Sequence, residues 1–458
     1  MTRTITMLGA TVGTTAALLA GCATAAPSHP AASHPAAATS AAGAAGGGAA
    51  APLEYARCMR SHGVPRFPNP VGGHITLSPA SGIDPDSPTV QAAATACARY
   101  GPAGSATGSG AGGASASAGG NAATADGAAW RALAATLKAD AAAGQFAGSV
   151  LVARDGVPVL DAGYGPADRA TGAADTPQTR FCIASIGKLF TAVAIGQLAE
   201  QGRVSFDAPV GDYLTGLPAA IADQVTIGQL LDMTAGLGDT VLGRANPPRS
   251  LDAMVALIAR ERPQFTPGAK FSYSNDDYIL LGAVVQAVSG ESYPDYLRRH
   301  VFGPAGMTRT GYAVYVPARV PGMAHGYAQT GSALTDVSAQ PQLANPSGGA
   351  YSTTGDLLKF ARAVLDHTLL TPAMTATLLA PRVSSPQPGG PPVDDYSYGF
   401  AYQQVNGVTF VGHNGGTPGY AGQLDIYPRS GWVVVVLTNQ DNTLVPVIQR
   451  TEAILTNS

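Results

Sequence analysis

Along residues 127–458, hydrophobic and polar positions recur with periods that predict both helices and strands. Two dipeptides, Asp155-Gly156 and Asn406-Gly407, are typical of tight hairpin turns, and each lies between two apolar runs. Between these hairpins the apolar runs have the length of helices. We therefore expect an α/β fold of the α+β type: one antiparallel sheet built from both ends of the domain, flanked by helices, with an inserted and mostly helical subdomain. The predicted strands are 149–154, 157–163, 400–405, 408–411, 422–427 and 432–438, after a helix at 130–143.

The first 126 residues lack this continuous periodicity. Residues 1–21 contain an uncharged apolar stretch that is too short to span a bilayer as a mature helix, which is typical of a signal peptide. Residues 22–51 and 102–126 consist mainly of Ala, Gly, Pro and Ser, and such segments cannot bury enough apolar surface to fold. We therefore expect a tether and a linker, with folded parts at 52–101 and 127–458.

The signal peptide ends in a motif of its own. Leu19, Ala20, Gly21 and Cys22 are consecutive, and together they resemble the bacterial lipobox, in which the cysteine is acylated and becomes the new N-terminus. The resemblance implies an exported protein that is held by lipid at the outer face of the bacterial cell membrane. The alternative is an ordinary cleaved signal peptide that is followed by a chance cysteine.

The segment 52–101 predicts a small helical module that contains Cys58 and Cys97. Outside the cell, an even pair of cysteines in a unit of this size predicts a disulfide. Closing a loop of ~40 residues contributes roughly 4 kcal/mol to stability in the chain-entropy model. A unit this small needs such a link because its core is small.

Charge and histidine distribution narrow the class of protein. Lys and Arg number 26 and Asp and Glu 29, which gives a formal net charge of −3 without basic runs. Nucleic-acid binding needs clustered basic side chains, so we expect no nucleic-acid partner. The histidines are scattered and no His-Glu-x-x-His sequence occurs, so we expect no metal and no cofactor.

The first candidate for chemistry lies at the start of an apolar helical run. Ser185 is followed three residues later by Lys188, one of only four lysines in the chain. A helix that is apolar on every side is buried, and its first turn presents the Ser185 hydroxyl and N–H at the positive end of the helix dipole. Desolvation lowers the pKa of Lys188 and leaves a neutral amine that can accept the Ser185 proton.

A second motif combines a phenol and an amide. Tyr273 and Asn275 precede a helix that is predicted over 278–288. A phenol near a cationic amine loses its proton more readily, which makes Tyr273 a second candidate base. The Asn275 amide can hold a substrate carbonyl or orient Lys188.

A third motif is the glycine-rich run around His413, which leads into the last predicted strand pair. Glycines such as Gly415 and Gly416 allow a substrate to lie against the edge of a strand. We expect His413 to present a hydrogen-bond donor beside that substrate.

In this order, Ser-x-x-Lys at 185–188, Tyr-x-Asn at 273–275 and His-x-Gly at 413–415 resemble the signature of the serine β-lactamase and penicillin-binding-protein superfamily. The resemblance covers residues 128–450 and is closest to the class C β-lactamase-like serine hydrolases. That group includes D-alanyl-D-alanine carboxypeptidases, D-aminopeptidases and esterases. Supporting runs that resemble the family lie at 226–237, 267–275, 346–352 and 437–439.

The resemblance implies a role for each residue. Ser185 is the acylated nucleophile, Lys188 is its general-base partner, and Tyr273 is the second base, which activates the deacylating water. Asn275 contacts the substrate, and the N–H groups of Ser185 and Gly416 form the oxyanion hole. The implied substrate is a small molecule or a peptidoglycan peptide that contains an amide or ester bond.

The third motif departs from the family pattern. Class C β-lactamases have a lysine there that binds the substrate carboxylate, whereas this chain has His413, which is mostly neutral at pH 7. This favours a lipid-anchored serine hydrolase with carboxypeptidase-like or esterase-like activity. A β-lactamase proper and a catalytically silent penicillin- or cell-wall-binding protein are the alternatives.

Cys182 lies three residues before Ser185 and is a rival candidate for the nucleophile. A cysteine nucleophile needs a His and an orienting Asn or Asp, and the sequence does not place these residues near Cys182. We therefore expect Cys182 to be a buried free thiol.

Overall fold

The computed structural model describes residues 118–457 except 245, 313 and 386–394, together with positions 56, 58–61, 64–65, 67, 87, 89–90 and 93. The chain divides into two units, Met1–Ala114 and Ser115–Ser458. The predicted signal peptide and tether, with Cys22, and the predicted disulfide partner Cys97 lie outside the described residues. Lipidation of Cys22 and the pairing of Cys97 with Cys58 therefore stay predictions.

In the first unit, the described residues form one small apolar cluster. Met59, Val64 and Phe67 are buried in it with two alanines, and Cys58 packs against it. None of the helices in the described part of the chain has the length and apolar character that crossing a bilayer requires.

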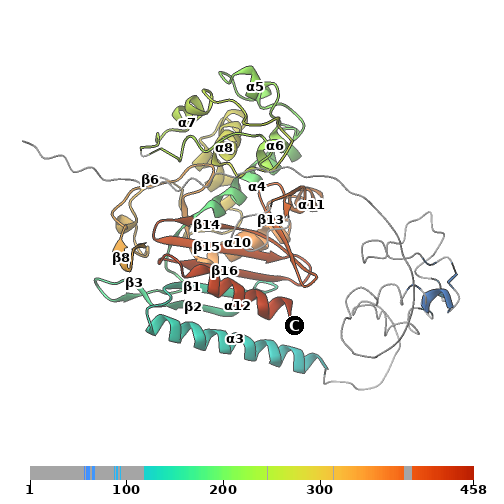
Figure 1. The fold of residues 1–458 in the computed structure, drawn as a ribbon, viewed down its shortest axis with the longest axis vertical. Helices are drawn as coiled ribbons and strands as arrows, with labels where there is room; N and C mark the ends of the chain where they lie inside the picture. The colour runs from blue at the N-terminus through green and yellow to red at the C-terminus, as the bar shows by residue number, and fades with distance from the viewer. Residues whose placement is uncertain are drawn as a thin grey trace, which may run out of the picture. The chain divides into compact units, whose positions relative to one another are not determined.

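The second unit is built on an antiparallel sheet in which the described residues form eight strands (Figure 1). The strand order is β11-β12-β13-β14-β15-β16-β1-β2, so the first strands of the domain lie beside the last one. Leu151 of β1, for example, is opposite Val435 of β16. The predicted sheet from both ends of the domain is thus confirmed. The strands are β1 (Gly148–Arg154), β2 (Val157–Tyr164), β11 (Val383–Ser384), β12 (Asp395–Tyr396), β13 (Ala401–Val405), β14 (Val408–Thr417), β15 (Tyr420–Tyr427) and β16 (Trp432–Thr438).

The two predicted hairpins have the expected turn geometry. Asp155 and Gly156 have φ values of 50° and 81°, and Asn406 and Gly407 have the same two values. Two consecutive residues with positive φ define the turn whose twist matches that of the flanking strands, and Asn, Asp and Gly adopt it most readily.

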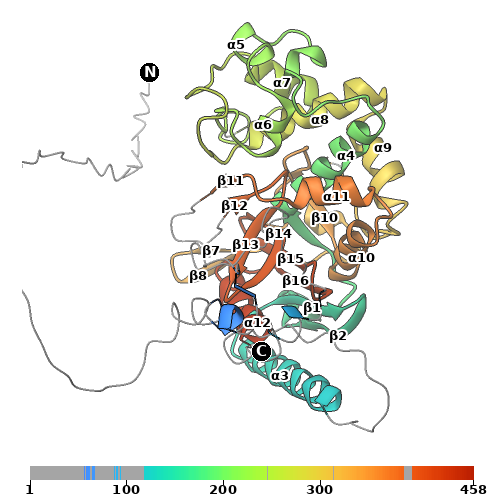
Figure 2. The same cartoon turned by 90° about the vertical axis from the view of Figure 1, so that its right-hand side faces the viewer.

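Helices cover both faces of the sheet (Figure 2). On one face, α3 (Ala118–Ala142) packs against β2 and α12 (Leu444–Thr456) packs against β15 and β16, with Trp130 and Val447 in the buried cluster. The other face is covered by α4 (Lys188–Glu200) and α10 (Thr354–Leu365), and α8 (Asn275–Ser289) packs against α4. Helix α3 begins at Ala118, so the end of the predicted 102–126 linker is helical.

The inserted helical region follows α4 and lies at the end of the unit opposite α3 (Figure 1). Most of its helices are short, and several begin at polar caps: the Thr226 hydroxyl accepts from the Gln229 N–H, and the Ser274 hydroxyl accepts from the Asp277 N–H. The remaining elements are η3 (Ser185–Gly187), η4 (Val210–Asp212), α5 (Ala219–Ala222), α6 (Ile227–Leu231), α7 (Leu251–Ile258), α9 (Tyr293–Tyr296), η5 (Leu297–Phe302), η6 (Pro317–Arg319), α11 (Pro372–Leu379), β3 (Pro166–Asp168), β4 (Ala173–Ala174), β5 (Phe181–Ala184), β6 (Val314–Tyr315), β7 (Tyr327–Thr330), β8 (Ala333–Asp336), β9 (Gln342–Leu343) and β10 (Ala350–Ser352).

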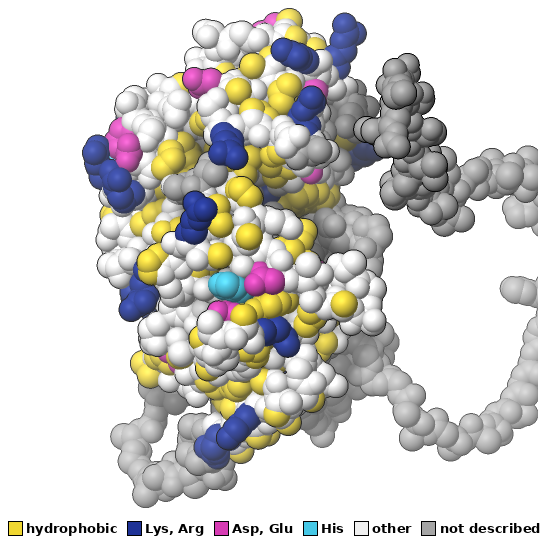
Figure 3. All heavy atoms as spheres, turned by 90° about the vertical axis from the view of Figure 1, so that its left-hand side faces the viewer, with side chains coloured by type: hydrophobic (Ala, Val, Ile, Leu, Met, Phe, Trp, Pro, Cys, Tyr) yellow, Lys and Arg dark blue, Asp and Glu magenta, His cyan; other side chains and the backbone are white. Residues whose placement is uncertain are grey.

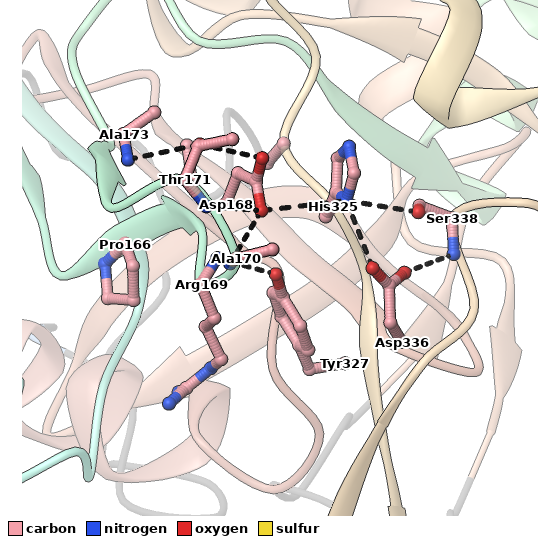
Figure 4. A network of polar contacts seen from close by, with 12 residues as sticks. Pro166, Asp168, Arg169, Ala170, Thr171, Ala173, His325, Tyr327, Asp336 and Ser338 are labelled. Carbon is pink, nitrogen blue, oxygen red and sulfur yellow. Dashed lines mark hydrogen bonds and ion pairs between the residues drawn. The ribbon is translucent and has the colours of Figure 1, made fainter.

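A polar network fastens the β7–β8 hairpin to the β3–β4 turn (Figure 4). The Asp168 carboxylate accepts a hydrogen bond from the Thr171 hydroxyl at 2.7 Å and lies 3.9 Å from Nδ1 of His325. The same Nδ1 is 3.0 Å from Asp336 and 3.2 Å from the Ser338 hydroxyl. Each of these side chains is paired with another member of the network. The network therefore holds the β3–β4 turn and the β7–β8 hairpin together.

Charged side chains are scattered over the face in Figure 3, where no patch of one sign gathers. Four large hydrophobic side chains are exposed among the described residues, namely Val157, Val159, Tyr273 and Val445. Val157 and Val159 lie in β2 and Val445 lies in α12, whereas Tyr273 directly precedes α8 in the inserted region.

Candidate active site

Ser185 lies on a strained turn between β5 and α4. Ala184 has φ 43°, a backbone conformation that few L-residues adopt and that is found mostly where function requires it. Two glycines approach this turn closely: a Cβ on Gly348 would lie 2.5 Å from the Ala184 carbonyl oxygen, and one on Gly415 would lie 2.7 Å from the Ser185 nitrogen. Glycine at 415 is therefore explained by the approach of β14 to the Ser185 turn. The expectation that Gly415 also lets a substrate lie against the strand edge stays a prediction.

The Lys188 amine has three oxygen neighbours. Its Nζ lies 3.1 Å from the Ser185 Oγ, 2.6 Å from the Asn275 Oδ1 and 2.7 Å from the Ser347 carbonyl oxygen. The amide and carbonyl oxygens only accept hydrogen bonds, so both must receive hydrogens from Lys188. A neutral amine has two hydrogens and one lone pair, and the lone pair then faces the Ser185 hydroxyl.

The surroundings of Lys188 favour that neutral form. The side chain is fully buried, and desolvation lowers the pKa of Lys188 to about 7. The carboxyl groups of Asp239 and Asp277 act in the opposite direction and raise the Lys188 pKa, but burial outweighs them. At neutral pH a large fraction of the amine is therefore able to accept a proton.

Tyr273 completes the contacts of Ser185. Its hydroxyl donates to the Ser185 Oγ at 2.8 Å, and the Lys188 Nζ lies 4.7 Å from the centre of its ring. Burial of this hydroxyl raises the pKa of Tyr273, although 38% of the residue is exposed. The expectation that the amine makes Tyr273 a stronger acid is therefore wrong: the phenol keeps its proton at neutral pH.

His413 lies beside Tyr273 but inside the protein. It is 3% exposed, and its Nδ1 donates to the Asn414 carbonyl while its Nε2 accepts from the Tyr396 hydroxyl at 3.1 Å. Burial lowers the pKa of His413 to about 3, so the ring is neutral. Because both ring nitrogens are used internally, the expected donor to substrate is absent. His413 instead supports the packing behind the Tyr273 ring, whose centre is 6.3 Å away.

A cavity of about 270 Å³ opens beside Ser185. Asn275 and Gly416 line it together with Ser185, and Gly415 does not. The described residues around the cavity are all uncharged. The structure thus brings Ser185, Lys188, Tyr273, Asn275 and Gly416 to one place.

Sequence reasoning missed two contributors to this site. Ser347 supplies the second carbonyl to Lys188, and its loop is held because the Thr191 hydroxyl donates to the Pro346 carbonyl at 2.6 Å. Asp239 accepts from the Asn275 Nδ2 at 3.0 Å, which turns the Asn275 oxygen toward Lys188. The resembling run at 346–352 was the available signal for Ser347, whereas nothing in the sequence marks Asp239.

The loop that carries Asp239 is itself anchored. The Asp276 carboxylate accepts from the Thr240 N–H at 2.7 Å and from the Val241 N–H at 3.3 Å. The Ser274 hydroxyl donates to the Gly238 carbonyl at 2.9 Å. The first turn of α8 therefore fixes both Asn275 and the carboxylate that orients it.

Chemically, this arrangement suits nucleophilic attack by Ser185. The Ser185 Oγ receives a hydrogen from Tyr273 and can give its own to the Lys188 lone pair. Among the described residues, no group of three or more His, Cys, Asp or Glu is placed to hold a metal ion.

Comparisons with known proteins agree with this geometry. The Beta-lactamase family model matches residues 133–456. Penicillin-binding protein 4 of Amycolatopsis lactamdurans is 30% identical over 294 residues, which cover 59% of this chain and 75% of that protein.

Two solved structures resemble the chain as well. The crystal structure of a penicillin binding protein from Bacillus halodurans is 33% identical, with a TM-score of 0.62, and the match covers 70% of this chain and 98% of the other. The octameric penicillin-binding protein homologue from Pyrococcus abyssi is 25% identical with a TM-score of 0.64, over 71% of this chain and 77% of the other.

Proposed function

From the premise that this chain belongs to the Beta-lactamase family of serine hydrolases, we propose that it cleaves amide or ester bonds through an acyl-enzyme on Ser185. The observation that carries the proposal is the buried Lys188 Nζ, which lies within hydrogen-bond distance of the Ser185 Oγ and of two carbonyl oxygens. In its neutral form the amine donates to the two carbonyl oxygens and keeps its lone pair for the Ser185 hydroxyl. A protein that only binds its ligand has no need of such a base. This argues against a catalytically silent penicillin- or cell-wall-binding protein.

The acylation step follows from these contacts. Lys188 takes the Ser185 proton as Oγ attacks the substrate carbonyl, and the N–H groups of Ser185 and Gly416 stabilise the oxyanion. Tyr273 keeps its proton at rest, so it passes that proton to the leaving group and recovers one from the Lys188 ammonium, whose Nζ lies 4.7 Å from the centre of the Tyr273 ring. In deacylation the same pair activates the water that releases the acyl group, which restores Ser185.

The uncharged cavity favours substrates without a carboxylate near the scissile bond. A β-lactam and a D-alanyl-D-alanine terminus each carry such a carboxylate, and the described lining offers no cation for it. The neutral, internally bonded His413 points to the same conclusion. We therefore place esterase-like or amidase-like activity ahead of carboxypeptidase and β-lactamase activity.

Labelling and turnover together test the proposed function. A fluorophosphonate probe is expected to add one equivalent to the native protein, with the adduct located on Ser185 by peptide mapping. A panel of p-nitrophenyl esters, a D-Ala-D-Ala peptide and a chromogenic cephalosporin then ranks the substrates, and we expect the esters to turn over fastest. The heat-unfolded protein is the control. Absence of an adduct would overturn the proposal, and faster turnover of the peptide or cephalosporin would reverse the substrate order.

We also propose that the protein is exported and anchored through an acylated Cys22, on the strength of the 1–21 leader and its last four residues. In a bacterial host that processes lipoproteins, the N-terminal peptide is expected to begin at Cys22 and to carry a diacylglycerol mass. Cys22→Ser is expected to move the protein from the membrane pellet to the soluble fraction. An unchanged distribution between the fractions would contradict anchoring.

A further inference from the structure

A four-residue turn that lines the active-site cavity carries one of the carbonyls that Lys188 contacts. The turn runs from Asn345 to Gly348, and these two residues exchange two backbone hydrogen bonds, each 2.8 Å long. Asn345, Ser347 and Gly348 line the cavity. Because the end residues bond to each other, the carbonyls of the central residues, Pro346 and Ser347, are left for partners outside the turn.

Helix α4 supplies the partner of each of these carbonyls. Lys188 and Thr191 are three residues apart on α4, which places them on the same face of the helix, and both are fully buried. The Lys188 Nζ lies 2.7 Å from the Ser347 carbonyl oxygen. The Thr191 hydroxyl donates to the Pro346 carbonyl at 2.6 Å. Two successive carbonyls of one turn are therefore bound by two successive polar side chains of one helix face.

Tyr293, at the start of α9, fixes the direction of the Thr191 hydroxyl. The Tyr293 hydroxyl lies 2.5 Å from the Thr191 Oγ1, and the residue is buried. Thr191 gives its single hydrogen to the Pro346 carbonyl, which can only accept, so Tyr293 donates to Thr191. A threonine inside a helix can instead turn its hydroxyl back to a carbonyl of its own helix. Tyr293 thus favours the rotamer of Thr191 that reaches the turn.

Helix α8 supports the turn by packing. A Cβ on Gly282 would lie 2.0 Å from the Cγ of Pro346, so the proline ring rests directly on the α8 backbone. This contact fixes where the turn lies, and the bond from Thr191 fixes which way the Pro346 carbonyl faces. Two soft dihedral angles separate this carbonyl from that of Ser347. The bond from Thr191 therefore also determines how the second carbonyl faces Lys188.

We propose that Thr191 is a positioning residue for the acylation of Ser185, because it holds the turn so that the second carbonyl stays on the Lys188 amine. Tyr293 acts through Thr191 to the same end. The inference rests on the proposed function, because it concerns the base of that reaction. With both carbonyls in place, the lone pair of the neutral amine faces the Ser185 hydroxyl. With the Asn275 oxygen alone, the amine turns about that one bond and the lone pair leaves the hydroxyl.

Thr191→Val removes the hydroxyl and keeps the shape of the side chain. We expect the acylation rate of Ser185 to fall by about 10- to 100-fold, since a misplacement of about 1 Å can cost up to ~100-fold. Stopped-flow release of p-nitrophenol from a p-nitrophenyl ester measures this rate. The melting temperature of each variant shows whether it is folded under the assay conditions.

The pH profile separates positioning from stability. Native kcat/KM is expected to rise with pH as the Lys188 amine becomes neutral, because the pKa of Lys188 is lowered to about 7. The Ser347 carbonyl stabilises the ammonium form, so its loss lowers the pKa of Lys188 further and moves the rising limb to lower pH by about one unit. A variant that is only less stable keeps the limb in place. Among the described residues, the other titratable groups that interact with Lys188 are unchanged in these variants, namely Asp239, Tyr273, Asp277, Tyr278 and His413.

Two conservative variants and a control complete the test. Thr191→Ser keeps the hydroxyl and is expected to keep the native limb and most of the native rate. Tyr293→Phe keeps the ring without the donor, and it is expected to lower the rate about threefold with a smaller shift of the limb in the same direction. Thr136→Val is the matched control, because the Thr136 hydroxyl is exposed on α3 and donates to the Ala132 carbonyl of its own helix. We expect this control to change neither the rate nor the limb.

Other outcomes overturn the inference. A native rate in Thr191→Val, or a lower rate with an unmoved limb, removes Thr191 as a positioning residue. An equal loss in Thr191→Ser and Thr191→Val does so too, because the hydroxyl would then not matter. If Thr191→Val does not fold, a native rate and limb in Tyr293→Phe overturn the inference instead.

Fluorophosphonate labelling of the native protein tests the proposed function separately. A labelled Ser185 in the native protein, with an unchanged Thr191→Val, refutes only the role of Thr191. An unlabelled native Ser185 refutes both the proposed function and the inference that rests on it.

Discussion

Ser185→Ala is expected to remove the fluorophosphonate adduct completely and to lower ester turnover by about 10⁶-fold, as loss of a serine nucleophile does in other hydrolases. The Ser185 Oγ is the atom on which the Tyr273 and Lys188 contacts converge, at 2.8 and 3.1 Å. Alanine leaves both partners in place without an atom that can be acylated. Intact mass and a p-nitrophenyl ester assay measure the two effects.

Cys182 provides the matched control because it lines the same cavity as Ser185. Burial raises the pKa of the Cys182 thiol, and a thiol reacts through its thiolate. Cys182→Ala is therefore expected to keep the adduct and most of the turnover of the p-nitrophenyl ester. If the adduct persisted in Ser185→Ala and vanished in Cys182→Ala, the nucleophile would be the cysteine.

The sheet and its hairpins were predictable because their signals are local. Asp155-Gly156 and Asn406-Gly407 need only their own backbone preferences to form a hairpin turn, and the flanking residues need only a period of two. Ser185 and Lys188 were found for a related reason. They are three residues apart, and the spacing alone puts them one turn apart. The predicted end of the linker, at residue 126, lies inside a helix: α3 extends back to Ala118 because alanine-rich sequence has high helix propensity.

The missed parts of the site depend on contacts between distant segments. Asp239 contacts Asn275, which is 36 residues away along the chain, and Ser347 contacts Lys188, which is 159 residues away. Local sequence patterns do not indicate contacts between residues that are so far apart along the chain. His413 shows a different limit: positions 410–413 of β14 are all buried, so the strand does not alternate before His413 and the sequence does not tell which way the ring points.

Lys188→Met is expected to lower the acylation rate of Ser185 by about 10⁴-fold, the upper range for loss of a general base. Methionine has a similar length and suits a buried position, but it has no basic lone pair to take the Ser185 proton. Stopped-flow release of p-nitrophenol measures acylation directly. Lys138→Met, at an exposed position of α3, is the control and is expected to leave the rate unchanged. A matching melting temperature for native protein and Lys188→Met excludes unfolding as the cause.

The pH dependence of native kcat/KM provides a sharper test of the same base. Lys188 must be neutral to accept a proton and its pKa is lowered to about 7, so activity is expected to rise with pH through about 7 and to be lost below it. The Asp239 carboxylate raises the pKa of Lys188. Asp239→Asn is therefore expected to move the rising limb of the pH profile to lower pH. Asp252→Asn, exposed on α7, is expected to leave it in place. No other contact of Ser185 loses a proton near neutrality. A rising limb near pH 4, or a limb near pH 7 that remains in Lys188→Met, would therefore assign the base to another group.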